Sequence, residues 1–236
     1  MIPQLSELWR LRRRIVRVLG EIQIDFGGGC SVSKAFVMAA LIQRYNLTTS
    51  VDIGVYRGRS LFPQAIAQQT IGGIAYGVDP WSAAEAREFD NLQLRDRINT
   101  FVETINLPAI YENVASRIEH MNLGRHCILL RQTSLEAARY FSDEEIRFGL
   151  IHIDGNHDIA PVLADVEAYL PLMHPHGVVV MDDVSWVTVK PAIARIEQTL
   201  VKTFERVDQW NDYAVFVHPD YATRYLNLIK FLGRFP

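Results

Sequence analysis

The sequence has few cysteines, little net charge and no long apolar run, and each of these absences argues against a class of protein. Its two cysteines, Cys30 and Cys127, lie far apart and are too few for a disulfide framework or a zinc site. The formal net charge is −3, so composition provides no electrostatic case for binding nucleic acid or an anionic membrane. No apolar run approaches the roughly 18 residues of a membrane span, and the first residues lack the pattern of a signal peptide. We therefore expect a cytoplasmic protein without nucleic-acid or membrane partners.

What is present is typical of one globular domain. The 236 residues are 49% hydrophobic and 22% charged, and the chain is long enough for one well-buried α/β core. Apolar residues recur at helical spacing between Leu5 and Ile24, interleaved with arginines, which favours an amphipathic helix with a solvated basic face. A contact in a homo-oligomer is the sharper alternative. A second helix is expected over Ser33–Tyr45, after the Gly27–Gly29 break. We expect these N-terminal helices to form a cap or an oligomer contact over residues 1–45, ahead of a domain over 46–236.

From residue 50 onward, short β-rich runs alternate with helical stretches. This alternation is typical of a parallel sheet covered by helices on both faces. The expected parallel strands are Ser50–Gly54, Ile74–Asp79, Cys127–Arg131, Leu150–Asp154 and Val178–Asp182, with helices that include Ala83–Asn106 and Pro161–Leu172. Two further strands, Phe204–Gln209 and Tyr213–Val217, are separated by a short turn and should form an antiparallel hairpin. The prediction is a Rossmann-like α/β fold with a mostly parallel seven-stranded sheet and an antiparallel C-terminal hairpin.

Ligands of open α/β sheets bind at the carboxyl ends of the strands, so the residues after each strand are informative. The first strand contains Asp52 and is followed by a turn with Gly54, Gly58 and Ser60. Two glycines allow a tight turn and a close approach of the backbone to a ligand. Their spacing differs from the three glycines of the dinucleotide fingerprint, and an acid here suits a cationic amino group better than a pyrophosphate. A purely structural turn is the alternative.

The residues after the second and third strands are placed to contact a nucleoside. Asp79 ends the second strand, about 25 residues after the glycine-rich turn, and a carboxylate there is placed to accept hydrogen bonds from a ribose diol. Trp81 either packs near an adenine or belongs to the core. Ser134 either caps the following helix or contacts the adenine.

Carboxylates end the fourth and fifth strands, at Asp154 and at the pair Asp182 and Asp183. Three carboxylates without a thiolate form a hard oxygen site, which suits Mg²⁺ or Mn²⁺ better than zinc. His157, three residues beyond Asp154, is a candidate general base because an unperturbed histidine titrates near pH 6.5. His152 lies within the strand and is interpreted as a packed core histidine.

Taken in order, the motifs VDIGVYRGRS, GVDPW, IHIDGNH and VVVMDDV resemble those of class I methyltransferases that use S-adenosylmethionine (SAM). The likeness is greater to the metal-dependent O-methyltransferases, which include catechol O-methyltransferase, macrolide-sugar methyltransferases and the cephalosporin-hydroxylase group. It extends over about Ser50–Asp183. The catechol enzymes have a lysine where this sequence has His157, so the resemblance favours a sugar or secondary-metabolite hydroxyl over a catechol.

The resemblance implies a role for each motif residue. The methionine portion of SAM would lie against Asp52, Gly54 and Gly58, with Ser60 nearby, and Asp79 would hold the ribose. The metal ligands would be Asp154, Asp182 and Asp183. The implied activity is Mg²⁺-dependent methyl transfer from SAM to a hydroxylated small molecule, with His157 and Asp154 as catalytic residues.

Other functions remain open. A metal-dependent hydrolase on a Rossmann-like fold could use the aspartates and His157 to activate water, but it leaves Gly54 and Asp79 without a role. A non-catalytic SAM-binding domain is a further alternative. A nicotinamide dehydrogenase would need the dinucleotide glycine spacing, which is absent.

Overall fold

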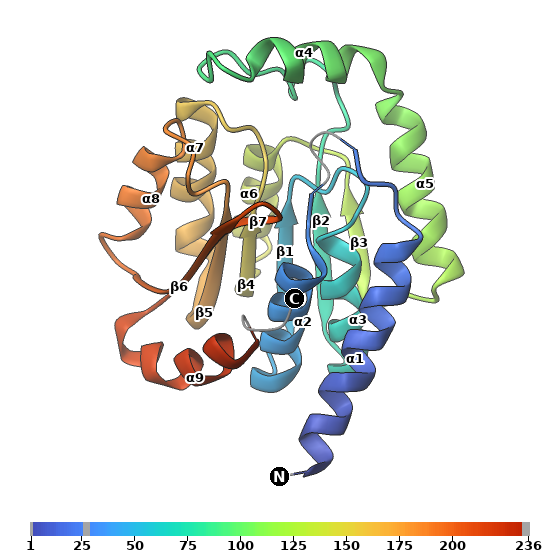
Figure 1. Ribbon diagram of the computed structural model, residues 1–236, viewed down its shortest axis with the longest axis vertical. Helices are drawn as coiled ribbons and strands as arrows, with labels where there is room; N and C mark the ends of the chain where they lie inside the picture. The colour runs from blue at the N-terminus through green and yellow to red at the C-terminus, as the bar shows by residue number, and fades with distance from the viewer. Residues whose placement is uncertain (1, 26–28, 233–236) are drawn as a thin grey trace.

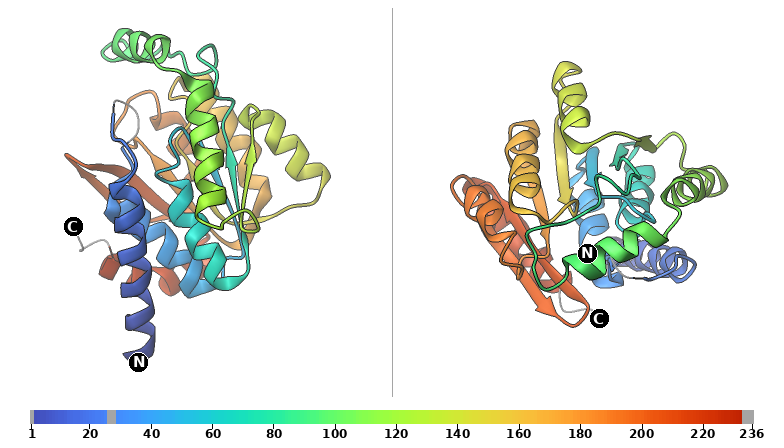
Figure 2. Two further views of the ribbon diagram at one scale, coloured as in Figure 1. Left: turned by 90° about the vertical axis from the view of Figure 1, so that its right-hand side faces the viewer. Right: turned by 90° about the horizontal axis from the view of Figure 1, so that it is seen from above.

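The computed structural model describes residues 2–25 and 29–232. It contains a seven-stranded sheet in the order β3-β2-β1-β4-β5-β7-β6, with helices on both faces (Figures 1 and 2). The strands are β1 (Thr49–Ile53), β2 (Ile74–Val78), β3 (Cys127–Leu130), β4 (Phe148–Ile153), β5 (Met173–Asp182), β6 (Val201–Asp208) and β7 (Asn211–Val217). Strands β1 to β5 pair in parallel, and β7 is antiparallel to both β5 and β6. The predicted Rossmann-like α/β fold with its C-terminal hairpin is confirmed.

The sheet is buried on both faces, which explains the uninterrupted apolar run in β5. Val178 and Val180 belong to one hydrophobic cluster, whereas Val179 and Met181 belong to the other, because successive side chains of a strand point to opposite faces. The first face packs against α1 (Ile2–Gly20), α2 (Val32–Tyr45), α3 (Leu61–Ile71), α5 (Leu107–His120) and α9 (Ala222–Leu232). The second packs against α6 (Ser134–Asp143), α7 (Ile159–Tyr169) and α8 (Lys190–Ile196).

The predicted helix over Ala83–Asn106 is wrong in its first half. Helix α4 (Arg95–Thr104) begins only at Arg95, and residues 82–94, here called the β2–α4 segment, form turns and irregular backbone. The amide groups of Phe89 and Asp90 donate to the Asp158 carboxylate, so they are not available for helical hydrogen bonds. Tertiary contacts thus override a helix-favouring sequence. Strands β5 and β6 also begin earlier than predicted.

Helix α1 packs its apolar stripe on its own chain. Leu11, Ile15 and Val18 are buried in the cluster that also contains α2 and α3. The stripe therefore no longer argues for a contact in a homo-oligomer. Of the predicted glycine break, Gly27 and Gly28 lie outside the described residues. Among the described helices, none has the length and apolar character needed to cross a membrane.

The topology brings four loops to one edge of the sheet. Strands β1 and β4 are neighbours, with β2 beyond β1 and β5 beyond β4. Their carboxyl ends therefore meet where the strand order reverses, which is the usual binding position in open α/β sheets. Helix α4 lies across this edge (Figure 1).

Candidate active site

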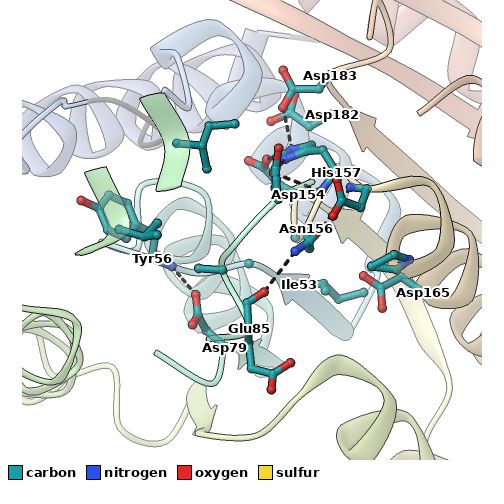
Figure 3. Close-up of a pocket in the computed structure, with 18 of the residues that line it drawn as sticks. Ile53, Tyr56, Asp79, Glu85, Asp154, Asn156, His157, Asp165, Asp182 and Asp183 are labelled. Carbon is teal, nitrogen blue, oxygen red and sulfur yellow. Dashed lines mark hydrogen bonds and ion pairs between the residues drawn. The ribbon is translucent and has the colours of Figure 1, made fainter. Parts of the chain in front are cut away.

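A cavity of about 930 Å³ opens at this edge of the sheet. Its walls come from the loops after β1 to β5, the turn between β6 and β7, the β2–α4 segment and α4. Figure 3 shows Asp79 on one side of the cavity and the carboxylates of β4 and β5 on the other. The site residues expected from sequence that line it are Gly54, Asp79, Ser134, Asp154, His157, Asp182 and Asp183. The remaining ones, Asp52, Gly58, Ser60 and Trp81, are not among its lining residues.

Asp52 is fully buried within the protein and is occupied by its own neighbours. Its Oδ2 accepts a hydrogen bond from Ser60 Oγ (2.7 Å), and its Oδ1 accepts one from Gln64 Nε2 (3.1 Å). His152 Nδ1 lies 2.5 Å from the same Oδ1. Asp52 and Ser60 thus hold the turn from β1 into α3, and their expected contact with a ligand remains a prediction. His152 is fully buried, as expected of a core histidine, but it has a carboxylate partner.

Gly58 and Trp81 also support the fold. Gly58 has a φ of +81°, and a Cβ added there would lie 2.6 Å from the Phe62 ring. Trp81 is 2% exposed, donates through Nε1 to the Tyr56 carbonyl oxygen (2.9 Å), and packs edge-on against Tyr111. Of the two roles considered for Trp81, the structure shows the one in the core. Gly58 also packs against the core and does not line the cavity.

Asp79 faces the cavity with both carboxylate oxygens held by backbone amides. The Tyr56 amide donates to Oδ2 (2.9 Å) and the Trp81 amide donates to Oδ1 (2.6 Å) (Figure 3). Burial raises the pKa of Asp79 to about 6, although these amide hydrogen bonds oppose the shift. Each carboxylate oxygen can accept more than one hydrogen bond, so the group remains able to bind a diol.

Ser134 is not a helix cap. The N-cap of α6 is Thr133, which forms a capping box with Glu136. Ser134 is the first helical residue, and its hydroxyl donates to Asp165 inside the cavity wall. Burial raises the pKa of Asp165 to about 6. Contact of Ser134 with an adenine remains a prediction.

A buried lysine connects the carboxylates that end β4 and β5. Lys34 of α2 is 4% exposed, and its ammonium donates to Asp182 and lies 3.7 Å from Asp154 Oδ2. Burial opposes the charge of Lys34, but Asp182, Cys30 and Asp154 together outweigh it and raise the lysine pKa well above its usual value. Burial and the nearby Asp154 raise the pKa of Asp182 to about 6. Burial also acts to raise the pKa of Asp154, but Lys34 and the hydrogen-bonding partners His157 and Asp182 together outweigh it and lower this pKa.

His157 joins this cluster to the β2–α4 segment. Its Nε2 lies 2.8 Å from Asp183 Oδ2 and 3.6 Å from Asp154 Oδ1, whereas its Nδ1 lies 2.6 Å from Glu88 Oε1. Burial disfavours the charged imidazole, but the three carboxylates outweigh this and raise the pKa of His157 well above its usual value. The ring of Trp186 packs at 4.8 Å beside the imidazole. His157 thus connects two parts of the cavity wall.

The donor set is compatible with a divalent cation. Within the described ranges, Asp154 belongs to two groups whose ligand atoms lie within 4.8 Å of one another: one with His152 and Asp182, the other with His157 and Asp183. The three aspartates expected as ligands do not form a single group of this kind, and imidazoles complete each set. Carboxylate oxygens suit Mg²⁺ and Mn²⁺. The acids of this cluster, Asp154, Asp182, Asp183 and Glu88, outnumber its cationic partners Lys34 and His157, so the residues fit a further cation.

Gly54 allows the β1 turn to pass close to the end of β4. Its φ is +88°, and a Cβ added there would lie 1.9 Å from the Asp154 carbonyl oxygen. Gly72 provides a matched control, since its φ is +74° but nothing lies within 4 Å of an added Cβ. We expect Gly72→Ala to lower the free energy of unfolding by about 1–2 kcal/mol through backbone strain alone. Gly54→Ala should lower it further, because the Asp154 backbone must move. Denaturant unfolding measures both, and equal losses would contradict the close approach.

The residues of the charged cluster that the sequence did not reveal are Lys34 and Glu88. The sequence gives a weak indication that Lys34 is special, because this lysine precedes eight consecutive apolar helical residues, Ala35–Ile42. For Glu88 there is none, since the sequence around it favours an exposed helix.

Comparison with known proteins identifies the family. A methyltransferase domain model matches residues 51–184. An uncharacterized protein of Sinorhizobium fredii, y4gI, is 27% identical over 135 residues, which cover 56% of this chain but 13% of that protein, so the chain spans a small part of this relative.

Solved structures have the same fold. An O-methyltransferase from Bacillus cereus in complex with SAH has a TM-score of 0.59 and 16% identity, with 91% of this chain and 89% of that chain covered. The O-methyltransferase TomG from Streptomyces achromogenes, involved in tomaymycin synthesis and in complex with SAM, has a TM-score of 0.57 and 13% identity, with the same coverage. The family model extends from β1 through β5 and includes Asp79, Asp154, Asp182 and Asp183. The chain belongs to this methyltransferase domain family.

Proposed function

We propose that the protein transfers a methyl group from SAM to a hydroxyl group of a small molecule, with Mg²⁺ or Mn²⁺ held by Asp154, Asp182 and Asp183. The observation that carries this proposal is a single cavity in which Asp79 lies on one side and the carboxylate cluster with His157 on the other. The cofactors of the Bacillus cereus enzyme and of TomG support the choice of SAM.

The cofactor side of the cavity is formed by Gly54 and Asp79. SAM supplies a methyl group on a positively charged sulfonium, and the acids of the wall favour that charge. Asp79, fixed by two amides, is suited to accept hydrogen bonds from both ribose hydroxyls. Gly54 leaves room because it has no side chain beside the Asp154 backbone.

Asp79→Ala is expected to weaken SAM binding about ten- to a hundred-fold, because charge-assisted hydrogen bonds contribute about 1.5–3 kcal/mol. SAM binding should also depend on pH. Since the pKa of Asp79 is raised to about 6, the carboxylate is protonated below that pH, and SAM affinity should fall as the pH drops through it. Titration calorimetry at several pH values tests both points. Unchanged affinity in the variant would remove Asp79 from the binding site.

The acceptor side of the cavity can deprotonate a hydroxyl. His157 presents Nε2 next to Asp154 and Asp183, and this buried nitrogen has no hydrogen bond of good geometry among the described residues. A neutral imidazole there accepts the hydroxyl proton as the oxygen attacks the methyl carbon in line with the departing sulfur. A divalent cation at the carboxylates, when bound, supplies Lewis-acid chemistry that lowers the pKa of the hydroxyl.

The charge of the wall favours an acceptor without phosphate or carboxylate groups. The lysine and arginine that line the cavity, Lys34 and Arg87, are paired with Asp182 and Glu103. The remaining charged groups of the wall are mostly acids, and the wall also includes large apolar side chains such as Phe101 and Trp210. A sugar or secondary-metabolite hydroxyl on an uncharged or cationic body fits these features.

The decisive experiment is a screen of sugars, glycosides and phenolic metabolites with SAM and Mg²⁺. Mass spectrometry should detect the added methyl group and SAH together. Neutral and cationic acceptors should be methylated in preference to phosphorylated ones. SAM binding without SAH formation across the screen would favour a non-catalytic binding domain, and ester hydrolysis without SAM would favour the hydrolase.

A further inference from the structure

The β2–α4 segment has an inverted pattern of burial. Glu88 is 3% exposed, and no other residue of the segment, all of which the structure describes, is buried. Two of its apolar residues, Phe89 and Leu92, are instead 62% and 73% exposed. An ionised carboxylate is costly to bury unless a partner compensates for the lost water. The placement of Glu88 therefore requires a specific interaction.

That interaction is with His157. Glu88 Oε1 lies 2.6 Å from His157 Nδ1 and accepts a hydrogen bond from the His157 backbone amide (3.2 Å). The backbone of Glu88 is fixed in turn by Asn99 of α4, whose side-chain amide accepts from the Glu88 N–H (3.0 Å) and donates to its carbonyl oxygen (2.9 Å). Because an ionised carboxylate only accepts, Glu88 keeps a proton on Nδ1 in both the charged and the neutral imidazole, so the proton that the ring gains or loses is the one on Nε2.

The segment around Glu88 is docked on the turn that contains His157. Asn156 Nδ2 donates to the carbonyl oxygens of Glu85 (3.1 Å) and Arg87 (2.7 Å). The Asp158 carboxylate accepts from the next two amides of the segment, and Asp90 Oδ2 accepts from the Ile159 amide (2.9 Å). The wall above the cavity and the histidine turn thus form one hydrogen-bonded unit.

We propose that Glu88 is a positioning residue for the base of the methyl transfer. It holds the Nδ1 proton of His157, so that Nε2 is the nitrogen presented to the acceptor hydroxyl next to Asp154 and Asp183. Glu88 belongs to the β2–α4 segment, which lines the cavity. When this segment packs on the histidine turn, it therefore also orients the His157 imidazole. The inference rests on the proposed function, in which His157 accepts a proton.

Two substitutions of Glu88 separate its hydrogen bond to the imidazole from its negative charge. Glu88→Gln keeps an oxygen that accepts from Nδ1, whereas Glu88→Ala removes it. Asp96→Asn, at an exposed acid of α4 outside the cavity wall, is the matched control for the loss of one negative charge. Partner residues of this kind change activity by about 10–10²-fold. We expect Glu88→Ala to lower kcat by this factor with little change in the KM for SAM, and Glu88→Gln to recover most of the loss.

A double-substitution cycle shows whether Glu88 acts through His157. In a His157→Ala background, Glu88→Ala should cause no further loss of kcat, because the group that it positions is gone. The same fold-loss in both backgrounds would overturn the inference.

A spectroscopic measurement tests the contact without an acceptor. With ¹⁵N-labelled histidine, and with His157 assigned from His157→Gln, the wild-type imidazole should show a hydrogen-bonded Nδ1 proton. This signal should persist in Glu88→Gln and be lost in Glu88→Ala, while SAM binding by calorimetry confirms that both variants are folded. An unchanged signal in Glu88→Ala would overturn the positioning role whatever the activity. The expected signals together with no turnover of any acceptor would contradict the proposed function instead.

Discussion

Replacing His157 by alanine is expected to lower the rate of methyl transfer by about 10²–10⁴-fold, the usual contribution of general acid–base catalysis. SAM affinity should stay near the wild-type value, because His157 contacts Glu88, Asp154 and Asp183 and is separate from Asp79. The wild-type rate should rise with pH, since a base acts in its deprotonated form. The carboxylates raise the pKa of His157, which shifts this rise upward, whereas a bound cation shifts it downward.

Single-turnover rates at several pH values, with saturating SAM and Mg²⁺, measure this effect. His120→Ala is a suitable control, because His120 is an exposed histidine of α5 outside the cavity wall. If His157→Ala kept both the wild-type rate and the pH profile, solvent rather than the imidazole would take the proton.

Removing the metal is expected to have the second large effect. Exhaustive chelation should abolish turnover, and Asp154→Asn should lower it by at least about 10³-fold, because Lewis-acid stabilisation contributes several kcal/mol. Asp154 is the informative position, since it belongs to both groups of potential ligands. SAM should still bind to the chelated protein, because Asp79 lies outside the carboxylate cluster.

The control for this substitution is Asp143→Asn, at an exposed aspartate at the end of α6. Metal analysis of the purified variants and SAM titration with and without chelator complete the test. Full activity after chelation would contradict the metal hypothesis and leave Lys34 as the cation next to Asp154 and Asp182.

Much of the site could be predicted because it depends on local patterns. Gly54, Asp79 and Asp154 directly follow strands whose apolar runs are recognisable, and parallel strands bring their carboxyl ends to one edge. The antiparallel hairpin could likewise be predicted from two β-rich runs with a short turn between them. These features need no knowledge of contacts between distant residues.

The rest depends on contacts that no local pattern encodes. Lys34 reaches Asp182 across 148 residues, and Glu88 reaches His157 across 69. Asp52 has the position expected of a ligand-binding acid, yet its side chain points toward α3 and bonds Ser60 and Gln64. The division at residues 45 and 46 remains a prediction, although α2 supplies a charge to the carboxylate cluster of the following domain.

The position of β7 has a consequence for the order in which the protein can mature. This strand is the last of the sheet to be synthesised, yet it lies between β5 and β6, with Tyr213 opposite Asp182 and with the Asp212 carbonyl oxygen accepting from the Asp183 amide (2.7 Å). Chains fold from the N-terminus as they leave the ribosome, so Gly54 and Asp79 emerge long before the strand that fixes these two aspartates. A nascent chain that ends before Val217 therefore has Gly54 and Asp79 without the strand that fixes Asp182 and Asp183, so the cavity can be completed only once the whole sheet has left the ribosome.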